Sequence, residues 1–218
     1  MNMTPCLLLM LRSPRLGRVK TRLARDLGEE TALALYKAFV EDMLEALDGC
    51  GAAITLWVDP AQDVDSIRGW LGHGRTCLPQ PEGDLGVKMD HAFRWAFEQG
   101  YAAAAALGSD IPQLSPRTAG HLARLLKSEP AVLGPSPDGG YWTIGFQADR
   151  YLPEAFVNMP WGTPEIFELT ERVLCPLQPA VLPELTDMDT LEDLRELVRS
   201  CPPGVAPRTL ALAGQFLG

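Results

Sequence analysis

Short apolar runs alternate with segments of helical periodicity along this chain. The runs 6–11 (CLLLML) and 52–58 (AAITLWV) have the length of buried strands. Between them, six apolar residues share one face of a predicted helix: Leu33, Tyr36, Val40, Met43, Leu44 and Leu47. A strand, a crossover helix and a second strand form a βαβ unit, which indicates an α/β fold with a mostly parallel sheet.

The same alternation continues toward the C-terminus. Residues 86–99 predict a helix, and the alanine-rich run 101–107, bracketed by glycines, predicts a buried strand although alanine favours helices. Capping residues, prolines and apolar runs predict further elements: a helix over 115–126, strands at 131–136 and 141–146, a helix from 163, a strand at 180–185 and a helix from 190. The tail beyond 201 is expected to be irregular before a short final helix. No linker interrupts this order, so we expect one domain over residues 1–218.

The distribution of charge narrows the class of ligand. The formal net charge of −9 argues against a nucleic-acid polymer as partner, because such binding depends on cations set against phosphates. Six of the 19 basic residues nevertheless cluster before the first acidic residue, Asp26: Arg12, Arg15, Arg18, Lys20, Arg22 and Arg25. A local cationic cluster on an acidic chain suits a small phosphorylated ligand.

The cysteines and the N-terminal apolar run indicate the cellular compartment of the protein. The five cysteines are widely spaced and include no C-x-x-C, so neither a disulfide framework nor a thiolate zinc site is indicated. This pattern favours a reducing cytoplasm. The apolar run at 6–11 is too short for a signal peptide or a membrane span and is expected to be a strand.

The stretch SPRLGRVKTRL, residues 13–23, directly follows the first predicted strand. It is not a P-loop, because two residues separate Gly17 from Lys20 and no earlier glycine has the required spacing. The dinucleotide fingerprint G-x-G-x-x-G is absent as well. The position, the glycine and the cations suit a phosphate-binding loop, and a solvated basic turn is the alternative.

Three aspartates that follow predicted strands are candidate metal ligands. Asp110 lies in LGSDIP, and Asp187 and Asp189 lie in TDMDT. Ligands of open α/β sheets bind outside the carboxyl ends of the strands, where a carboxylate is well placed for a hard divalent cation. The alternatives are a turn or cap for Asp110 and complementation of a helix dipole for the pair.

Other motifs have an ordinary structural interpretation beside a functional one. The tripeptide 138–140 (DGG) lies between two predicted strands, where it usually forms a hairpin turn. The stretch 81–86 (PEGDLG) can be an ordinary loop that ends at the start of a helix. Trp161 can lie in the core or in a lid. The three histidines lack ligand spacing, and no Ser-His-Asp or Cys-His arrangement is indicated.

Six stretches, taken in order, resemble the motifs of the bacterial radical-SAM/selenodomain-associated transferase family, which is similar to phospholactate guanylyltransferase and to molybdenum-cofactor nucleotidyltransferases. They are RSPRLGRVKTRL (12–23), GDLGVKM (83–89), GSDIP (108–112), GPSPDGGY (134–141), PWGTP (160–164) and DMDT (187–190). The resemblance covers residues 6 to about 198. Arg12 stands at the family's first lysine and Lys88 at its arginine, which keeps the charge but changes the geometry of phosphate contacts.

The resemblance implies a GT-A fold, a three-layer sandwich with a mixed, mostly parallel sheet, in a transferase that uses Mg²⁺ or Mn²⁺. It implies roles for four groups of residues: Arg12, Gly17, Lys20 and Arg22 at the phosphates, Asp84 and Gly86 near the base or sugar, Asp138, Gly139, Gly140 and Trp161 at the acceptor, and Asp110, Asp189 and Asp187 at the metal. Lys20 and Asp110 would be the catalytic residues, and positioning and neutralisation of phosphate charge would supply most of the catalysis.

The reaction stays open at this stage. The donor would be a nucleotide or a nucleotide-diphospho-sugar and the acceptor a small molecule, but a fold does not decide between nucleotidyl and glycosyl transfer. The alternative from another class is a nucleotide- or metabolite-binding protein without turnover. Such a protein would share the phosphate-binding loop and would not require the metal carboxylates.

Overall fold

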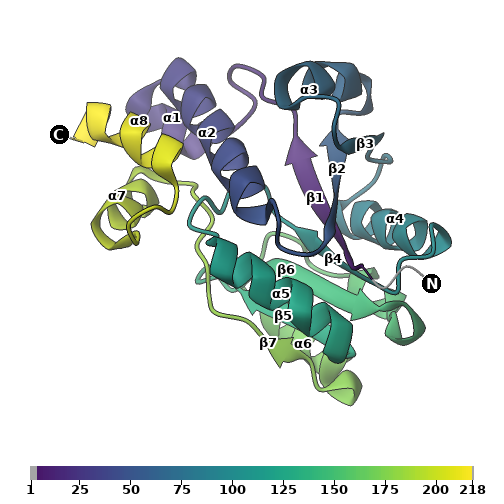
Figure 1. Cartoon of the computed structure of the whole chain (residues 1–218). Coiled ribbons are helices and arrows are strands. Elements are labelled where there is room, and N and C mark those ends of the chain that lie inside the picture. Colours follow the sequence, from purple (N-terminus) through teal and green to yellow (C-terminus); the bar gives the residue numbers. More distant parts are fainter. Residues whose placement is uncertain (1–3, 218) are drawn as a thin grey trace.

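A computed structural model describes residues 4–217, which form one mixed sheet between layers of helices (Figure 1). Its strands are β1 (Cys6–Arg12), β2 (Ala53–Asp59), β3 (Thr76–Pro79), β4 (Ala103–Leu107), β5 (Ala131–Pro135), β6 (Tyr141–Gln147) and β7 (Ala180–Val181). Across the sheet they lie in the order β3-β2-β1-β4-β6-β5-β7. β6 runs antiparallel to both neighbours and the other pairs are parallel, which confirms the predicted mixed, mostly parallel sheet.

Helices cover both faces of this sheet (Figure 1). They are α1 (Thr21–Leu27), α2 (Glu29–Leu47), α3 (Val64–Leu71), α4 (Leu85–Glu98), α5 (Pro116–Ser128), α6 (Ile166–Leu174), α7 (Leu191–Ser200) and α8 (Pro207–Leu217). Successive side chains of β1 point to opposite faces. Leu7 and Leu9 pack with α2 and α5, whereas Cys6 and Leu8 pack with α4 and with the 3-10 turn Pro153–Phe156. Burial on both faces explains why β1 is apolar from Cys6 to Leu11, and the result is a three-layer α/β/α sandwich.

The strand pairing leaves a space between the carboxyl ends of the central strands β1 and β4. β1 pairs with β2 as far as Arg12 and Asp59, but its last pair with β4 is Leu9 with Leu107. Beyond that pair, the carboxyl ends of β1 and β4 separate. Such a separation between neighbouring parallel strands is where open α/β sheets bind their ligands.

Side-chain caps fix the starts of three helices. Ser115 accepts a hydrogen bond from Thr118 N at the start of α5. Thr190 and Asp193 form the capping box that the sequence predicts at α7. Asp84 caps α4 by accepting a hydrogen bond from Val87 N.

The structure also corrects several predicted elements. The strand predicted at 180–185 shortens to Ala180–Val181 because Pro183 has no N–H for the ladder, although Leu182 N still donates to Leu133 O. The helix α3 and the short edge strand β3 were not predicted from the sequence. The predicted crossover helix is α2, and the separate short helix α1 precedes it, with Gly28 between them at a positive φ of 83°. The final helix expected in the tail is α8.

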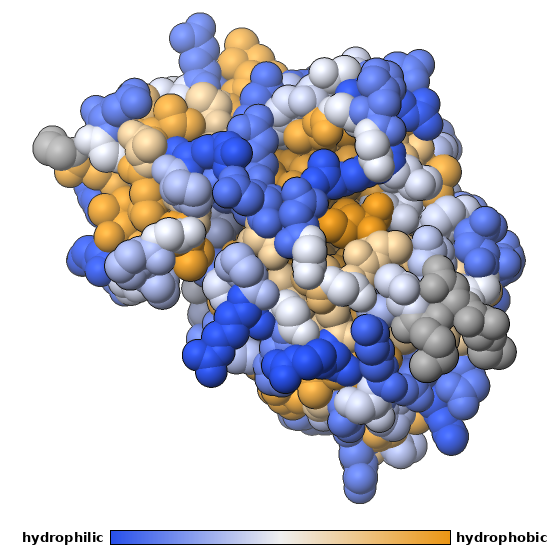
Figure 2. Space-filling model, in the orientation of Figure 1, coloured by the Kyte–Doolittle hydropathy of each residue, from blue (hydrophilic) through white to orange (hydrophobic). Residues whose placement is uncertain are grey.

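Polar residues cover most of the face seen in Figure 2, and apolar residues show mainly where the sheet runs between α2 and α4 and beside α7 and α8. No helix within residues 4–217 is both long and apolar enough to cross a membrane.

Candidate functional site

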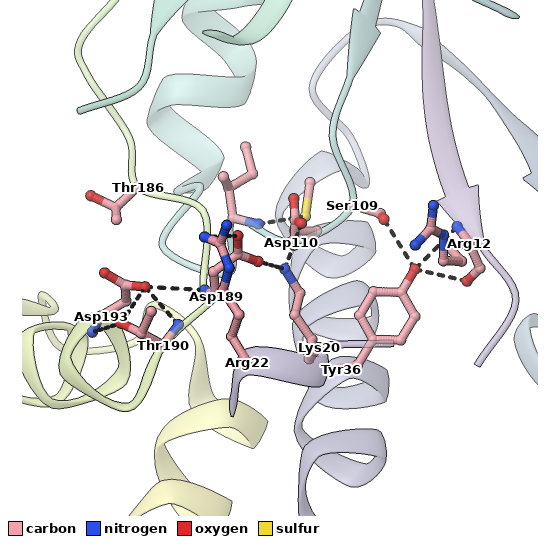
Figure 3. A network of polar contacts seen from close by, with 12 residues as sticks. Arg12, Lys20, Arg22, Tyr36, Ser109, Asp110, Thr186, Asp189, Thr190 and Asp193 are labelled. Atoms are coloured by element: carbon pink, nitrogen blue, oxygen red, sulfur yellow. Dashed lines mark hydrogen bonds and ion pairs between the residues drawn. The ribbon is translucent and has the colours of Figure 1, made fainter. Parts of the chain in front are cut away.

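The loop after β1 places Lys20 between two carboxylates. Lys20 precedes α1 in the left-handed conformation, with φ 48°, which is uncommon for a residue other than glycine and marks candidate functional positions. Its Nζ donates to Asp110 Oδ2 at 2.6 Å and to Asp189 Oδ1 at 2.8 Å (Figure 3). The three residues that the sequence assigned to phosphate and metal therefore meet at one point.

The electrostatics of this cluster keep Lys20 charged. Its side chain is 6% exposed, against 28% for Asp110 and 46% for Asp189. Burial by itself would lower the pKa of Lys20, but the two carboxylates outweigh it and hold that pKa above its ordinary value. Lys20 is therefore an ammonium ion at neutral pH, largely withdrawn from solvent.

Backbone contacts bring the two acidic segments together. Asp110 follows β4, and its carbonyl oxygen accepts a hydrogen bond from Met188 N at 2.9 Å. Asp189 N donates to Asp193 Oδ2, so the capping box of α7 also fixes this aspartate. Because Met188 lies between Asp187 and Asp189, this one hydrogen bond brings the whole pair to the end of β4.

Tyr36 of α2 bridges the separated ends of β1 and β4. Its hydroxyl donates to Arg12 O at 2.8 Å, accepts from Arg12 N at 3.2 Å and lies 3.1 Å from Ser109 Oγ (Figure 3). The side chain is buried, and burial raises the pKa of Tyr36 to about 12, so the hydroxyl is neutral. The bridge fixes Arg12 relative to the residue before Asp110.

A cavity of about 420 Å³ opens above this network, and we call it the strand-end cavity. Its lining includes four basic residues and the two carboxylates: Arg12, Arg18, Lys20, Arg22, Asp110 and Asp189. Arg22 is 69% exposed and its Nη1 lies 3.7 Å from Asp189 Oδ2. Gly17 is not part of the lining; it turns the loop with φ 68° beside the Glu29 carboxylate. Most of the predicted phosphate and metal residues therefore face one cavity.

A second cavity of about 290 Å³ lies beside the β5–β6 loop and includes Arg22, and we call it the hairpin cavity. Its lining contains most of the predicted acceptor residues together with one metal candidate: Asp138, Gly140, Trp161 and Asp187. Burial, and then the neighbouring carboxylates, led by Asp110, raise the pKa of Asp187 to about 8. Arg22 borders both cavities, so they adjoin.

A third cavity of about 400 Å³ adjoins the strand-end cavity on the other side. The two cavities share Arg12, Ser109 and Asp110, and Lys88 also lines the third one. The Lys88 ammonium pairs with Asp59 at the end of β2, 3.2 Å away. The three cavities together form a continuous polar region along the carboxyl ends of the strands.

Three motif residues have contacts that belong to packing and capping. A Cβ on Gly139 would collide with the carbonyl oxygen of Pro164, and a Cβ on Gly86 would collide with Phe156 O and crowd Trp161. Both glycines are therefore required where another segment of the backbone approaches closely. Asp84 caps α4 and is exposed. Neither Asp84 nor Gly86 lines the three cavities described above.

The donor set fits a hard divalent cation. Asp110 and Asp189 already converge on one positive charge, and Mg²⁺ and Mn²⁺ prefer carboxylate, phosphate and water oxygens. Within residues 4–217, no three His, Cys, Asp or Glu side chains form a metal-binding group by themselves. Two aspartates are enough where phosphate and water complete the octahedron, as is usual for Mg²⁺.

Two residues of the network escaped the sequence analysis. Tyr36 was assigned to the apolar face of a helix, and Ser109 was not singled out. The signal for Tyr36 is a hydroxyl within an otherwise apolar stripe, because a buried tyrosine hydroxyl needs a partner.

The fold is of the class found in nucleotidyltransferases and nucleotide-diphospho-sugar transferases. A proposed nucleotide-diphospho-sugar transferase from Desulfovibrio desulfuricans G20 is 32% identical, with a TM-score of 0.92 over 99% of this chain and 95% of that one. A nucleotidyl transferase from Methanothermobacter has a TM-score of 0.59 at 12% identity, covering 89% of this chain and 95% of that one. The manganese complex of Rv0371c from Mycobacterium tuberculosis H37Rv has a TM-score of 0.52 at 13% identity, covering 90% and 99%.

The particular family follows from the sequence. The chain belongs to DUF2064, a family described as uncharacterized proteins conserved in bacteria, whose model matches residues 25–163. No curated protein matches the chain. The likeness to the two more distant structures shows the shared fold.

Proposed function

We propose that this protein is a metal-dependent transferase that acts on a nucleotide or nucleotide-diphospho-sugar and transfers a nucleotidyl or glycosyl group to a small acceptor. The observation that carries the proposal is the strand-end cavity, in which Lys20, Asp110 and Asp189 meet and which Arg12 and Arg22 also line. Cations and metal-type carboxylates side by side suit a metal–phosphate ligand. The transferase neighbours and the motif resemblance support the same class.

The residues divide into two groups by position. Arg12, Lys20 and Arg22 would contact phosphate oxygens, and Asp110 and Asp189, with Asp187 beside them, would hold Mg²⁺ or Mn²⁺. The bound cation would neutralise phosphate charge. The manganese complex of the distant neighbour Rv0371c supports the use of a divalent cation in this fold.

The acceptor would occupy the hairpin cavity, because Arg22 places that cavity directly beside the phosphates. Asp138 offers a carboxylate to an acceptor hydroxyl, and Trp161 offers an apolar surface. The chain would therefore hold the donor and the acceptor next to one another, and positioning of this kind needs no covalent nucleophile. We place the protein in the cytoplasm, where its five free cysteines stay reduced.

A thermal-shift screen tests the proposal. Nucleotides and nucleotide-sugars are each added with Mg²⁺, with Mn²⁺ and with a chelator, since a ligand selective for the native state raises its melting temperature. We expect stabilisation by at least one of these compounds that depends on the divalent cation. If none of them stabilises the protein under any of these conditions, the proposed function is wrong.

The product then identifies the reaction. Release of pyrophosphate indicates nucleotidyl transfer from a nucleoside triphosphate, and release of a nucleoside diphosphate indicates glycosyl transfer. Binding that is undiminished by the chelator, with no product from any donor, would instead identify a binding protein without turnover.

A further inference from the structure

The position of Lys20 creates a conflict between two of the proposed roles. Its ammonium is held by Asp110 and Asp189 at 2.6 and 2.8 Å and is almost fully buried, so it is committed to carboxylates and is not open to a phosphate. The same two carboxylates are the proposed ligands of the divalent cation. Mg²⁺ binds carboxylate oxygens at about 2.0–2.1 Å, so the metal and the ammonium exclude one another from this position.

We propose that the site takes up a divalent cation and a polyphosphate as one metal–polyphosphate ligand, and that Lys20 couples the two. This inference rests on the proposed function and specifies its ligand. A cation alone would have to displace the buried ammonium of Lys20, which would then have no anion to bind in place of the two carboxylates. A polyphosphate alone would approach two carboxylates while Lys20 is still held by them. Each ion by itself therefore binds weakly.

When both ions bind, every charged group keeps an oppositely charged partner. Asp110 and Asp189 release the ammonium and bind the cation, and the ammonium binds a phosphate oxygen. The flexible four-carbon stem of Lys20 allows this movement, whereas its backbone at the start of α1 can stay in place. Linkage requires that the cation strengthens polyphosphate binding by the same factor by which the polyphosphate strengthens cation binding.

Arg22 provides a matched control in the same cavity. It carries the same charge, but it is 69% exposed and lies 3.7 Å from Asp189, so it already faces solvent and need not leave a carboxylate pair. Removal of Arg22 changes the net charge of the cavity as much as removal of Lys20 does. A difference between the two variants therefore reports the position of Lys20 and not its charge alone.

The first experiment measures binding of Mn²⁺ alone by calorimetric titration to the unmodified protein, Lys20→Met and Arg22→Met. We expect Lys20→Met to bind Mn²⁺ about 10-fold more tightly than the unmodified protein, within the range typical of coupled sites. Arg22→Met should gain clearly less. Lys20→Arg, which keeps a cation between the carboxylates, should bind Mn²⁺ as weakly as the unmodified protein. Equal Mn²⁺ affinity in Lys20→Met and the unmodified protein, or an equal gain in Arg22→Met, would overturn the proposal.

The second experiment titrates inorganic tripolyphosphate with and without Mn²⁺. The direct contact between Mn²⁺ and phosphate is present in every variant, so the enhancement that remains in Lys20→Met measures that contact alone. We expect the enhancement to be several-fold larger in the unmodified protein, and equal enhancement in both would contradict the role of Lys20. If Lys20→Met does not fold, Lys20→Gln replaces it, because its amide still donates to a carboxylate without the charge.

The outcome is independent of the nucleotide screen. Both probes are inorganic, so a screen without a hit would reject the proposed function while the coupling could still be measured. Equal Mn²⁺ affinities would reject the coupling and leave the proposed function standing.

Discussion

The strand-end cavity and the hairpin cavity adjoin at Arg22, but different kinds of contact build them. In the strand-end cavity, Lys20 is buried between two carboxylates and adopts a backbone conformation that residues other than glycine rarely take. These contacts add little apolar packing. Around the hairpin cavity, Gly139 and Gly86 have no side chain, so the backbone of Pro164 approaches Gly139 and the backbone of Phe156 approaches Gly86. Trp161 also packs on Gly86. The contacts there are those of a tightly packed scaffold.

This difference shows that residues within a sequence motif can serve either packing or a candidate functional site. Glycines in GPSPDGGY and GDLG are required because one segment of chain approaches another, so they report on packing first. Charged residues in RSPRLGRVKTRL and GSDIP are held in a costly arrangement that packing does not require, and such arrangements mark functional sites. Substitutions in each of the two regions test this division.

The largest effect is expected for Gly139→Ala in the scaffold. Its φ of 84° and the collision of an added Cβ with Pro164 O should together cost about 3 kcal/mol of the free energy of unfolding. Urea denaturation measures this loss. Gly140→Ala is the control, because its Cβ would meet only the Asp138 side chain and its backbone does not require glycine. Equal stability of the two variants would contradict the packing role of Gly139.

Asp110→Asn should have the next largest effect, on ligand binding. The substitution preserves size and removes one of the two charged carboxylates proposed to hold the cation, so affinity for the best nucleotide of the screen in the presence of Mn²⁺ should fall by about 10-fold or more. Calorimetric titration measures it, and a melting curve checks the fold. Asp138→Asn, in the hairpin cavity, should leave this affinity nearly unchanged. An equal loss in both variants would mean that the two cavities do not divide donor from acceptor.

Tyr36→Phe tests how the strand-end cavity is supported. The hydroxyl bonds both backbone polar groups of Arg12, and its loss should cost about 1–3 kcal/mol of stability because buried partners are left unsatisfied. Nucleotide affinity should fall less than in Asp110→Asn, since no contact with the ligand is removed. Unchanged stability would show that the bridge is dispensable. Ser109→Ala, which removes one of the three contacts of the hydroxyl, should give a smaller loss.

The sequence was sufficient to predict the architecture because buried strands have a strong local signal. The runs that became β1, β2 and β4 are covered on both faces, so apolar residues predominate on both sides of each strand. The edge strand β3 has four residues, two of them exposed, and its pattern is too short to distinguish from a loop. The strand predicted at 180–185 failed at Pro183, where an apolar run continues but the backbone donor is missing.

The sequence supplied the candidate residues and the expectation that Asp110 and Asp189 lie close together, but it did not predict the ion pairs that both make with Lys20. Their places after strands made Lys20 a phosphate candidate and Asp110 and Asp189 metal candidates beside ordinary structural alternatives, and the motif resemblance implied the functional roles. Their meeting joins residues 90 and 169 positions apart, which no local pattern contains. The bridge made by Tyr36 was missed for the same reason, since it connects three elements through one hydroxyl.

The smallest effect is expected for Asp84, which the motif resemblance assigns to the nucleotide and the structure uses as the cap of α4. A capping carboxylate is replaced well by asparagine and poorly by alanine, so Asp84→Ala should lose about 1 kcal/mol of stability while Asp84→Asn loses little. Both variants should bind the nucleotide as the unmodified protein does, because Asp84 lines none of the three cavities described above. Urea denaturation and calorimetric titration of the two variants distinguish the roles. Weaker nucleotide binding in both, with stability unchanged, would place Asp84 with the charged residues of the site and not with the scaffold glycines, and the division between the two regions would then fail at this motif.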